Sequence, residues 1–214
     1  MSNEKKFVGV AKSVWRNPNN HVWISGKIVD VQFSHESHGE NFYRGIMECG
    51  RLSGVIDKIP VILSEYLINP NLSRKKIMLE GEYRSRNVPD STGKTHLQLY
   101  LFVINLYEID CEQTNYQGGE NQIVLNGYLC KPPVYRKTPL EREITDILLA
   151  VNRLNGISDY IPVILWGRAA RFAAKLSVGD NVELTGRIQS RNYTNGEGVL
   201  LTAYEVSGAV INKL

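Results

Sequence analysis

Hydrophobic and polar residues alternate along most of the chain, as is typical of β-strands with one buried face. The order is clearest after Asp159. An apolar run at residues 161–166 predicts a buried strand, and Gly167 ends it. Apolar residues then recur at helical spacing over residues 168–176, and an alternating run follows at residues 182–186. A strand, a short helix and a strand in a strand-rich chain indicate an OB-type barrel between its third and fourth strands.

The rest of the chain is predicted to form strands joined by turns. We expect an added strand in an N-terminal arm over residues 1–20, and then strands at residues 22–29, 45–50, 59–63, 76–83 and 96–109. Residues 35–41 and 87–94 are polar and rich in turn formers, so we expect loops there. Gly26 lies inside a predicted strand, where glycine usually marks a bulge or a sharp bend.

The second half of the chain repeats the order of the first. HVWISGKI at residues 21–28 corresponds to QIVLNGYL at 122–129, IPVIL occurs at both 59–63 and 161–165, and LEGEYRSRN at 79–87 corresponds to LTGRIQSRN at 184–192. Offsets of 101, 102 and 105 residues drift so little that they indicate two homologous domains. The predicted fold is all-β with one short helix per domain, in two tandem OB-fold Greek-key barrels. We place them at residues 1–115 and 116–214, joined near Tyr116.

Composition narrows the possible functions. The chain is 43% hydrophobic and 22% charged, with a formal net charge of +3, so a basic surface would need Lys and Arg clustered on one face. Cys49, Cys111 and Cys130 are odd in number and lack CxxC spacing, which argues against a disulfide framework or a zinc site. Neither a signal peptide nor a membrane-length apolar run is found, so we expect a cytoplasmic protein with no membrane partner.

Aromatic and cationic residues of the second repeat suit a groove for single-stranded nucleic acid, which pairs base-stacking rings with a cationic track. Tyr160 and Trp166 are six positions apart in one predicted strand, so both side chains point to the same face. Residues 161, 163 and 165 already supply an apolar core face, so we expect the two aromatics to face outward; the alternative is that they pack in the core. The other candidates in this repeat are Tyr193, Arg153, Arg168, Arg187 and Arg191.

Four segments of the second repeat have a specific order and spacing. They are N-x-V/I-x-L-x-G at residues 121–127, LLAVNR at 148–153, SDYIPVILWGRAA at 158–170 and LSVGDNVELTGRIQSRNY at 176–193. Together they resemble the bacterial single-stranded DNA-binding protein family over nearly all of this repeat. The resemblance implies sequence-independent binding and protection of single-stranded DNA in replication, recombination or repair. It also implies that Tyr160, Trp166 and Tyr193 stack on bases.

The same resemblance implies partners. A fused pair of such domains resembles the two-domain members of the family, in which a homodimer supplies four barrels, and replication or recombination proteins are possible further partners. The family usually ends in an acidic-tipped tail that recruits other proteins, whereas this chain stops at Leu214, so recruitment through such a tail is not expected. The expected location is the bacterial nucleoid, or association with a mobile element.

The first repeat departs from the family pattern. It has Lys58, Ser64 and Val88 where the second repeat has its three aromatics. Phe42, Tyr43 and Tyr100 are replacement candidates whose direction the sequence does not give. The cations Lys58, Arg84, Arg86 and Lys94 could hold phosphates without gripping bases. We therefore expect the second repeat to carry most of the stacking energy.

Two other classes of function have less support in the sequence. The barrels could mainly bind proteins, as in a primosome-like or scaffolding module with weak nucleic-acid affinity, and the first repeat fits this better than the second. An enzyme has little support, because no phosphate-binding glycine motif, nucleophile elbow or pair of catalytic acids can be assembled. His35 and His38 lie in a polar segment typical of a solvated hairpin, so we expect no metal site there and no cofactor.

Overall fold

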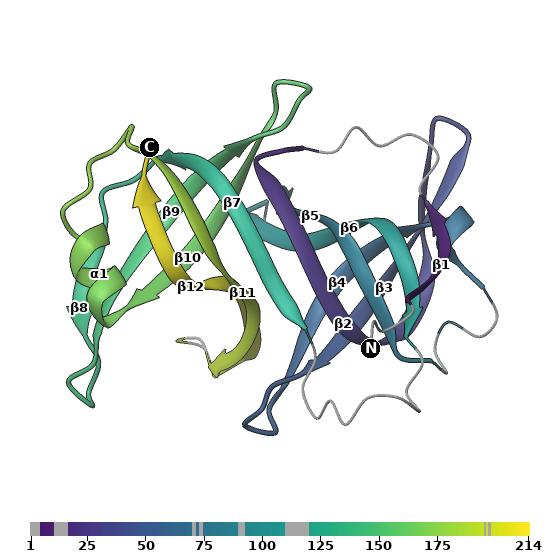
Figure 1. The fold of residues 1–214 in the computed structure, drawn as a ribbon, viewed down its shortest axis with the longest axis horizontal. Coiled ribbons are helices and arrows are strands. Elements are labelled where there is room, and N and C mark those ends of the chain that lie inside the picture. The colour runs from purple at the N-terminus through teal and green to yellow at the C-terminus, as the bar shows by residue number, and fades with distance from the viewer. Residues whose placement is uncertain are drawn as a thin grey trace. The chain divides into compact units, whose positions relative to one another are not determined.

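The computed structural model describes residues 5–10, 17–69, 72, 75–89, 93–109, 120–194, 196 and 198–214. Its backbone contacts divide the chain into two compact units (Figure 1). Unit 1 consists of Met1–Arg16, Val22–Tyr83 and Tyr100–Asn121, and unit 2 consists of Asn17–His21, Arg84–Leu99 and Gln122–Leu214. The predicted join near Tyr116 lies outside the described residues, so the division at that point stays a prediction.

Five strands of the first repeat close into a barrel. They are β2 (Asn20–Ser37), β3 (Glu40–Gly50), β4 (Ile56–Ser64), β5 (Ile77–Pro89) and β6 (Thr95–Ile109). Their pairing runs β2–β3–β4–β6–β5 and returns to β2, with β4 and β6 parallel. Strand β1 (Lys5–Val10) pairs with β6, which confirms the added strand expected in the N-terminal arm.

The second repeat closes a barrel of the same order. Its elements are β7 (Asn121–Leu129), β8 (Val134–Lys137), β9 (Glu143–Asn152), β10 (Ser158–Trp166), α1 (Gly167–Ala173), β11 (Asn181–Thr194) and β12 (Leu200–Lys213). The ring runs β7–β9–β10–β12–β11 and returns to β7, β8 extends it beside β9, and α1 packs against β9 and β10 (Figure 1). This order, with the helix between the third and fourth ring strands, is that of an OB-fold. The predicted fold class is confirmed.

Glycines in the first strand of each ring allow close backbone approach. A Cβ on Gly26 would lie 2.0 Å from the carbonyl oxygen of Glu48, and one on Gly127 would lie 2.7 Å from that of Ala150. Each of these carbonyls belongs to the strand that pairs next in the ring. At Gly26, where a bulge or sharp bend was expected, the structure shows close backbone approach, and the register shifts of β2 against β3 lie further along the strand.

The structure corrects several predicted boundaries. Residues 35–41 are not a loop, because β2 and β3 continue to a two-residue turn at His38 and Gly39. Strand β5 likewise runs on to Pro89, into the second predicted loop. Hairpin strands continue beyond the core through cross-strand hydrogen bonds, so their polar tips need no apolar alternation that would reveal them in the sequence.

The helices differ between the two barrels. Helix α1 ends at Ala173, three residues earlier than predicted, and among the described residues at the matching place the first barrel has the three-residue 3-10 helix η1 (Glu65–Leu67). The short helix predicted for the first domain falls partly on residues 70, 71, 73 and 74, which lie outside the described residues, so it stays a prediction there. Pro70 follows η1 closely in the sequence, and proline disfavours helical backbone in the residue before it.

Candidate nucleic-acid interface

Strand β10 presents Tyr160 and Trp166 on its outer face. The odd-numbered residues from Asp159 to Leu165 are buried at 1% exposure or less, whereas Tyr160 and Trp166 are each 41% exposed. The buried set fills the barrel and leaves the alternate positions outside. The expectation that both aromatics face outward is confirmed, while their contact with nucleic acid stays a prediction.

The chain turns sharply directly after Trp166. Gly167 has a φ of +54°, a backbone conformation that residues with a Cβ rarely adopt, and α1 begins at this residue. Trp166 is therefore the last residue of β10, with Arg168 two residues further on in the first turn of the helix. Arg168 is exposed, so a cation stands close in sequence to the exposed indole ring.

Strand register extends this outer face onto β11. Ile164 of β10 lies beside Ser207 of β12 in the parallel pair, and Ser207 lies opposite Arg187 of β11. Side chains of neighbouring residues in adjacent strands point to the same side of a sheet. Arg187 therefore shares the outer face with Tyr160 and Trp166.

Arg191 and Tyr193 follow on the same side of β11, four and six residues beyond Arg187. The direction of β11 carries them toward the end of the sheet at which Tyr160 lies. We call Tyr160, Ile164, Trp166, Arg187, Arg191 and Tyr193 the outer face of the second barrel. The structure thus brings five residues predicted from the sequence onto one side of one barrel.

Tyr193 has a cation over its ring. The guanidinium carbon of Arg191 lies 5.9 Å from the ring centroid, and Tyr193 is 40% exposed. Glu205 is 3.7 Å from Arg191 Nε and accepts a hydrogen bond from Gln189 Nε2 at 2.8 Å. The carboxylate steadies Arg191, which remains more than half exposed at 56% and accessible to a phosphate.

Arg168 and Arg187 differ from Arg191 in their surroundings. Within the part of the chain that the structure describes, neither forms an ion pair. Arg168 is exposed and Arg187 is half-buried. A cation without a carboxylate partner exchanges water for a phosphate at lower cost, so these two side chains suit phosphate contacts.

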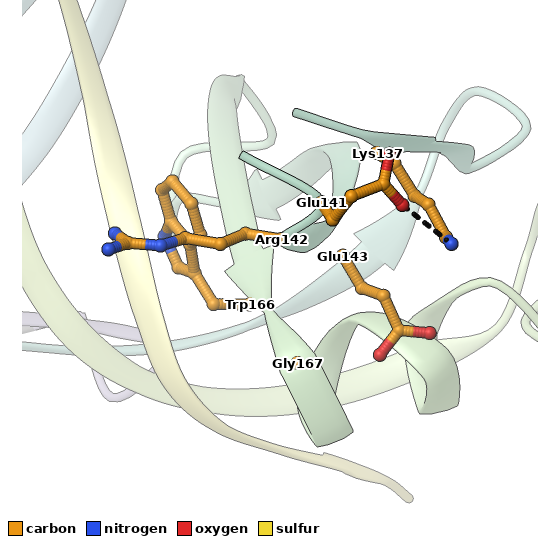
Figure 2. A pocket seen from close by; sticks show the side chains of 6 residues that line it. All are labelled: Lys137, Glu141, Arg142, Glu143, Trp166 and Gly167. Carbon is orange, nitrogen blue, oxygen red and sulfur yellow. Dashed lines mark hydrogen bonds and ion pairs between the residues drawn. The ribbon is translucent and has the colours of Figure 1, made fainter. Parts of the chain in front are cut away.

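A shallow pocket lies at Trp166, between the end of β10 and the β8–β9 hairpin. It is lined by Trp166, Gly167, Lys137, Glu141, Arg142 and Glu143. Figure 2 shows the Arg142 side chain extending toward the Trp166 indole, whereas Glu143 points toward α1. Glu141 pairs with Lys137 at 3.0 Å. The indole side of the pocket is therefore cationic, although the pocket as a whole holds both signs.

Glu143 contacts both the β8–β9 hairpin and α1. It accepts a hydrogen bond from Tyr135 Oη at 2.7 Å and pairs with Arg171 of α1. The hydrogen bond from Tyr135, followed by that from Arg171, lowers the pKa of Glu143, and the same bond raises the pKa of Tyr135. These contacts hold the pocket wall against α1.

Arg153 is engaged in a buried ion pair, which separates it from the other predicted cations. Its guanidinium bonds both oxygens of Asp159, at 2.6 and 2.8 Å, and donates to Ser85 O at 3.2 Å. Asp159 is fully buried and also accepts from Ser85 N at 2.6 Å. Arg51 and Asp57 form the same pair in the first repeat, at 2.5 and 2.7 Å. We therefore assign Arg153 a structural role and leave it out of the interface.

The predicted cations of the first repeat lie in both units. Lys58 is exposed on β4 in unit 1 and pairs with Glu48 at 3.3 Å. Arg84, Arg86 and Lys94 belong to unit 2, where Arg84 is half-buried and the other two are exposed. Arg86 Nε donates to Gln98 Oε1 at 2.6 Å across the β5–β6 hairpin. Val88 is half-buried at the position that matches Tyr193.

Two residues that the sequence reading missed lie near the outer face. Tyr128 of β7 is 45% exposed and lies opposite Ala150, which is itself opposite Tyr160. The outward direction of the Tyr128 side chain could have been predicted from the sequence. It alternates with Ile123, Leu125, Gly127 and Leu129, which are buried. Arg142 could not be found in this way, since it lies in the turn of a hairpin whose strand β8 has no clear sequence pattern.

His35 and His38 each contact a neighbouring serine, with His35 Nδ1 3.1 Å from Ser34 Oγ and His38 Nδ1 2.9 Å from Ser37 Oγ. Among the described residues, no three His, Cys, Asp or Glu side chains are grouped so that they could hold a metal ion. No helix in the described ranges has the length and apolar character needed to cross a membrane.

Comparison with known proteins gives matches of two kinds. The model of the single-strand binding protein family matches residues 120–214. Single-stranded DNA-binding protein B of Bacillus subtilis is 38% identical over 93 residues, which are 40% of this chain and 82% of that protein. Single-stranded DNA-binding protein 1 of Lactococcus lactis is 38% identical over 93 residues, and the chain covers 62% of its length.

A solved structure is similar over nearly the whole chain. The wild-type single-stranded DNA binding protein from Thermus aquaticus has a TM-score of 0.68 and 19% sequence identity, over 91% of this chain and 92% of that one. At this identity the likeness shows the fold, and it includes both repeats. The sequence matches in the second repeat show more: the chain belongs to the single-strand binding protein family.

Proposed function

We propose that the chain binds single-stranded DNA without sequence preference and covers it during replication, recombination or repair. The observation that carries this proposal is the outer face of β10, where Tyr160 and Trp166 are each 41% exposed while the alternate residues fill the core. Large aromatic side chains held open to solvent on a rigid strand are suited to stacking on bases. The names of the Bacillus subtilis and Lactococcus lactis relatives support the same ligand.

On the outer face of the second barrel, the aromatic rings bind bases and the arginines bind phosphates. Tyr160, Trp166 and Tyr193 stack on successive bases, each stack contributing roughly 1–3 kcal/mol. Arg168, Arg187 and Arg191 contact the phosphates between them. Every base has a stacking face, so binding is tolerant of sequence, whereas a duplex hides these faces between its own base pairs.

A titration with three labelled ligands of one sequence tests the proposal: single-stranded DNA, the matching RNA and the duplex. We expect the single strand to bind more tightly than the duplex. The logarithm of the affinity should fall with the logarithm of salt concentration, with a slope of about −0.7 for each phosphate neutralised. Equal affinity for the duplex and its separated strand would contradict the proposal, and the RNA titration shows whether the sugar matters.

We also propose that two chains associate, so that four barrels act together. Two-fold symmetry is the commonest form of self-association, and the two-domain members of the family that the chain resembles are dimers. Sedimentation at micromolar concentration should show twice the mass of one chain. A monomer with undiminished DNA binding would count against association.

A further inference from the structure

The first barrel lacks an aromatic residue at the end of β4. Ser64 stands there, 102 positions before Trp166, and it is buried. Its Oγ accepts a hydrogen bond from Tyr66 N at 3.3 Å, and its hydroxyl donates to Glu40. Ser64 thus caps η1 and offers no ring to a base.

Phe42 supplies an aromatic ring beside this position. It lies directly opposite Ser64 across the β3–β4 pair, and His35 lies directly opposite Phe42 across the β2–β3 pair. Opposed residues point to the same side of a sheet, so His35, Phe42 and Ser64 form one row on the outer side. The rings of His35 and Phe42 are stacked, with centroids 5.2 Å apart and planes inclined by 16°.

A β-bulge makes this row possible. Phe33 and His35 are two residues apart and would share one face of a regular strand. The register of β2 shifts between them, so that Phe33 pairs with Tyr43 while His35 pairs with Phe42. Bulges redirect side chains in this way. Phe33 and Tyr43 make an edge-to-face contact of their own, with centroids 5.9 Å apart.

Phe102 joins the row from β6. It lies beside Ile62 in the parallel β4–β6 pair, and its ring centroid is 6.0 Å from that of Phe42. We call His35, Phe42 and Phe102 the Phe42 cluster. The matching positions of the second barrel hold Arg136, Ile144 and Ser207. The first barrel has therefore lost one aromatic residue from this region and gained three rings on neighbouring strands.

The Phe42 cluster combines one open ring with a nearby cation. His35 is exposed, and Phe42 and Phe102 are half-buried, so the row is held by packing while one ring is open. Arg44 is exposed two residues along β3 from Phe42 and lies opposite Ile62, on the same side of the sheet. The carboxylates of Glu40 and Glu65 lie at Ser64 and Asn41. A phosphate backbone would therefore run on the side of Arg44, whose guanidinium donates to Gln32 Oε1 at 3.0 Å.

We infer that the Phe42 cluster is a second base-stacking site, which binds single-stranded nucleic acid on the first barrel. The inference rests on the proposed function and extends it, because it assigns base contacts to a repeat that lacks all three aromatics of the second. A base stacks on the row of His35 and Phe42, Phe102 closes its inner end, and Arg44 meets the adjoining phosphate. Bases of the bound single-stranded DNA then stack on aromatic rings of both barrels.

The test uses the full-length chain and a labelled oligothymidylate of about 35 nucleotides, long enough for two barrels at site sizes of about 4–16 nucleotides each. Phe42→Leu keeps an apolar side chain and removes the ring. Phe33→Leu is the matched control, since Phe33 lies on the same hairpin, is 58% exposed and faces the other side. Phe42→Leu removes the ring on which the open His35 ring is stacked. We expect it to weaken binding by about five- to 150-fold, the range of one stack, and to shorten the occluded site, with Phe33→Leu unchanged.

The possible results separate this inference from the proposed function. If the unaltered chain does not bind the oligonucleotide, the proposed function fails. If Trp166→Ala weakens binding while a folded Phe42→Leu variant keeps full affinity and site size, the cluster only packs the hairpin and the inference alone is overturned. Should Phe42→Leu lower the thermal midpoint, His35→Ala, which removes the exposed ring, decides by the same criterion.

Discussion

Strands β4 and β10 share a core face and differ on the outer face. Both contain the segment IPVIL, and its first, third and fifth residues are buried in each barrel. On the outer side, β4 has Lys58 and Ser64 where β10 has Tyr160 and Trp166. A change of volume inside a packed barrel leaves a cavity or a clash. The exposed positions of the outer side, such as Lys58, Tyr160 and Trp166, carry no such constraint, so the two repeats differ there while the fold is the same.

The difference extends across neighbouring strands. Register places His35, Phe42 and Ser64 in one row of the first barrel, and Arg136, Ile144 and Trp166 in the matching row of the second. On β5, Glu82 stands where the second barrel has Arg187, but Glu82 is buried, whereas Arg187 is half-buried. The first barrel is therefore a rearranged outer surface with rings on different strands and a different pattern of charge. It is not simply the second barrel without its aromatics.

The largest effect should be on the frame that the two barrels share. Asp57→Ala and Asp159→Ala each remove the buried carboxylate that pairs with Arg51 or Arg153, whose side chains are only 21% and 17% exposed. Each change should lower the free energy of unfolding by about 3–5 kcal/mol. Urea unfolding of each variant measures this loss of stability. A large loss in one barrel and none in the other would show that the frames are not equivalent.

Trp166→Ala tests whether the aromatic residue at the end of β10 contributes to DNA binding, as its counterpart Ser64 in the first barrel is not expected to. We expect a loss of roughly 1–3 kcal/mol in binding free energy for single-stranded DNA, with little change in stability, because the indole is 41% exposed. Phe172→Ala is the matched control, since Phe172 is 40% exposed on α1 and outside the defined outer face. Fluorescence anisotropy measures both. Unchanged affinity in a folded Trp166→Ala variant would contradict the proposal that Trp166 stacks on a base.

Ser64→Ala should give the reverse result at the matching position. Ser64 accepts the capping hydrogen bond from Tyr66 N, so its loss should lower the free energy of unfolding by about 1 kcal/mol. DNA affinity should stay the same, because the side chain is buried. Thermal unfolding and anisotropy on one sample compare the two quantities. A loss of affinity without a loss of stability would show that Ser64 itself contacts the ligand.

Arg168→Ala and Arg187→Ala test the cations of the second barrel. Each should weaken binding at low salt and reduce the salt slope by about 0.7, as one phosphate contact is lost. Lys58→Ala provides the comparison in the first barrel, where Glu48 lies 3.3 Å from the ammonium group and already offsets its charge. We expect a smaller change of slope for Lys58. Equal changes would mean that the first barrel contributes a phosphate contact of the same quality.

The smallest effect concerns pH and the second barrel alone. The pKa of Glu143 is lowered below its ordinary value of 4.5, chiefly by the hydrogen bond from Tyr135. A lowered folded-state pKa contributes stability above the unfolded value that is lost as pH falls through the folded one. The contacts of the β8–β9 hairpin with α1 should therefore loosen only below about pH 4.5. NMR titration of the Glu143 carboxyl checks this, and a midpoint above 4.5 would contradict it.

The site was predictable where its pattern is local. The outward direction of Tyr160 and Trp166 follows from alternation within one strand, and the structure confirms it. Arg153 could not be judged in this way, because its partner Asp159 is met only across a loop. The direction of Phe42 was open for a similar reason, since it depends on pairing with two neighbouring strands.

The sequence by itself determined the repeat, the barrel class and the inner face of each strand, because core positions must alternate and must keep their volumes in both copies. Only the tertiary structure decided which outer residues meet. Arg187 comes to the face of Trp166 through two steps of strand pairing, and one bulge in β2 turns His35 onto Phe42 while Phe33 faces away. Register and bulges depend on hydrogen bonds between distant strands, and a single residue of shift exchanges the two faces of a strand.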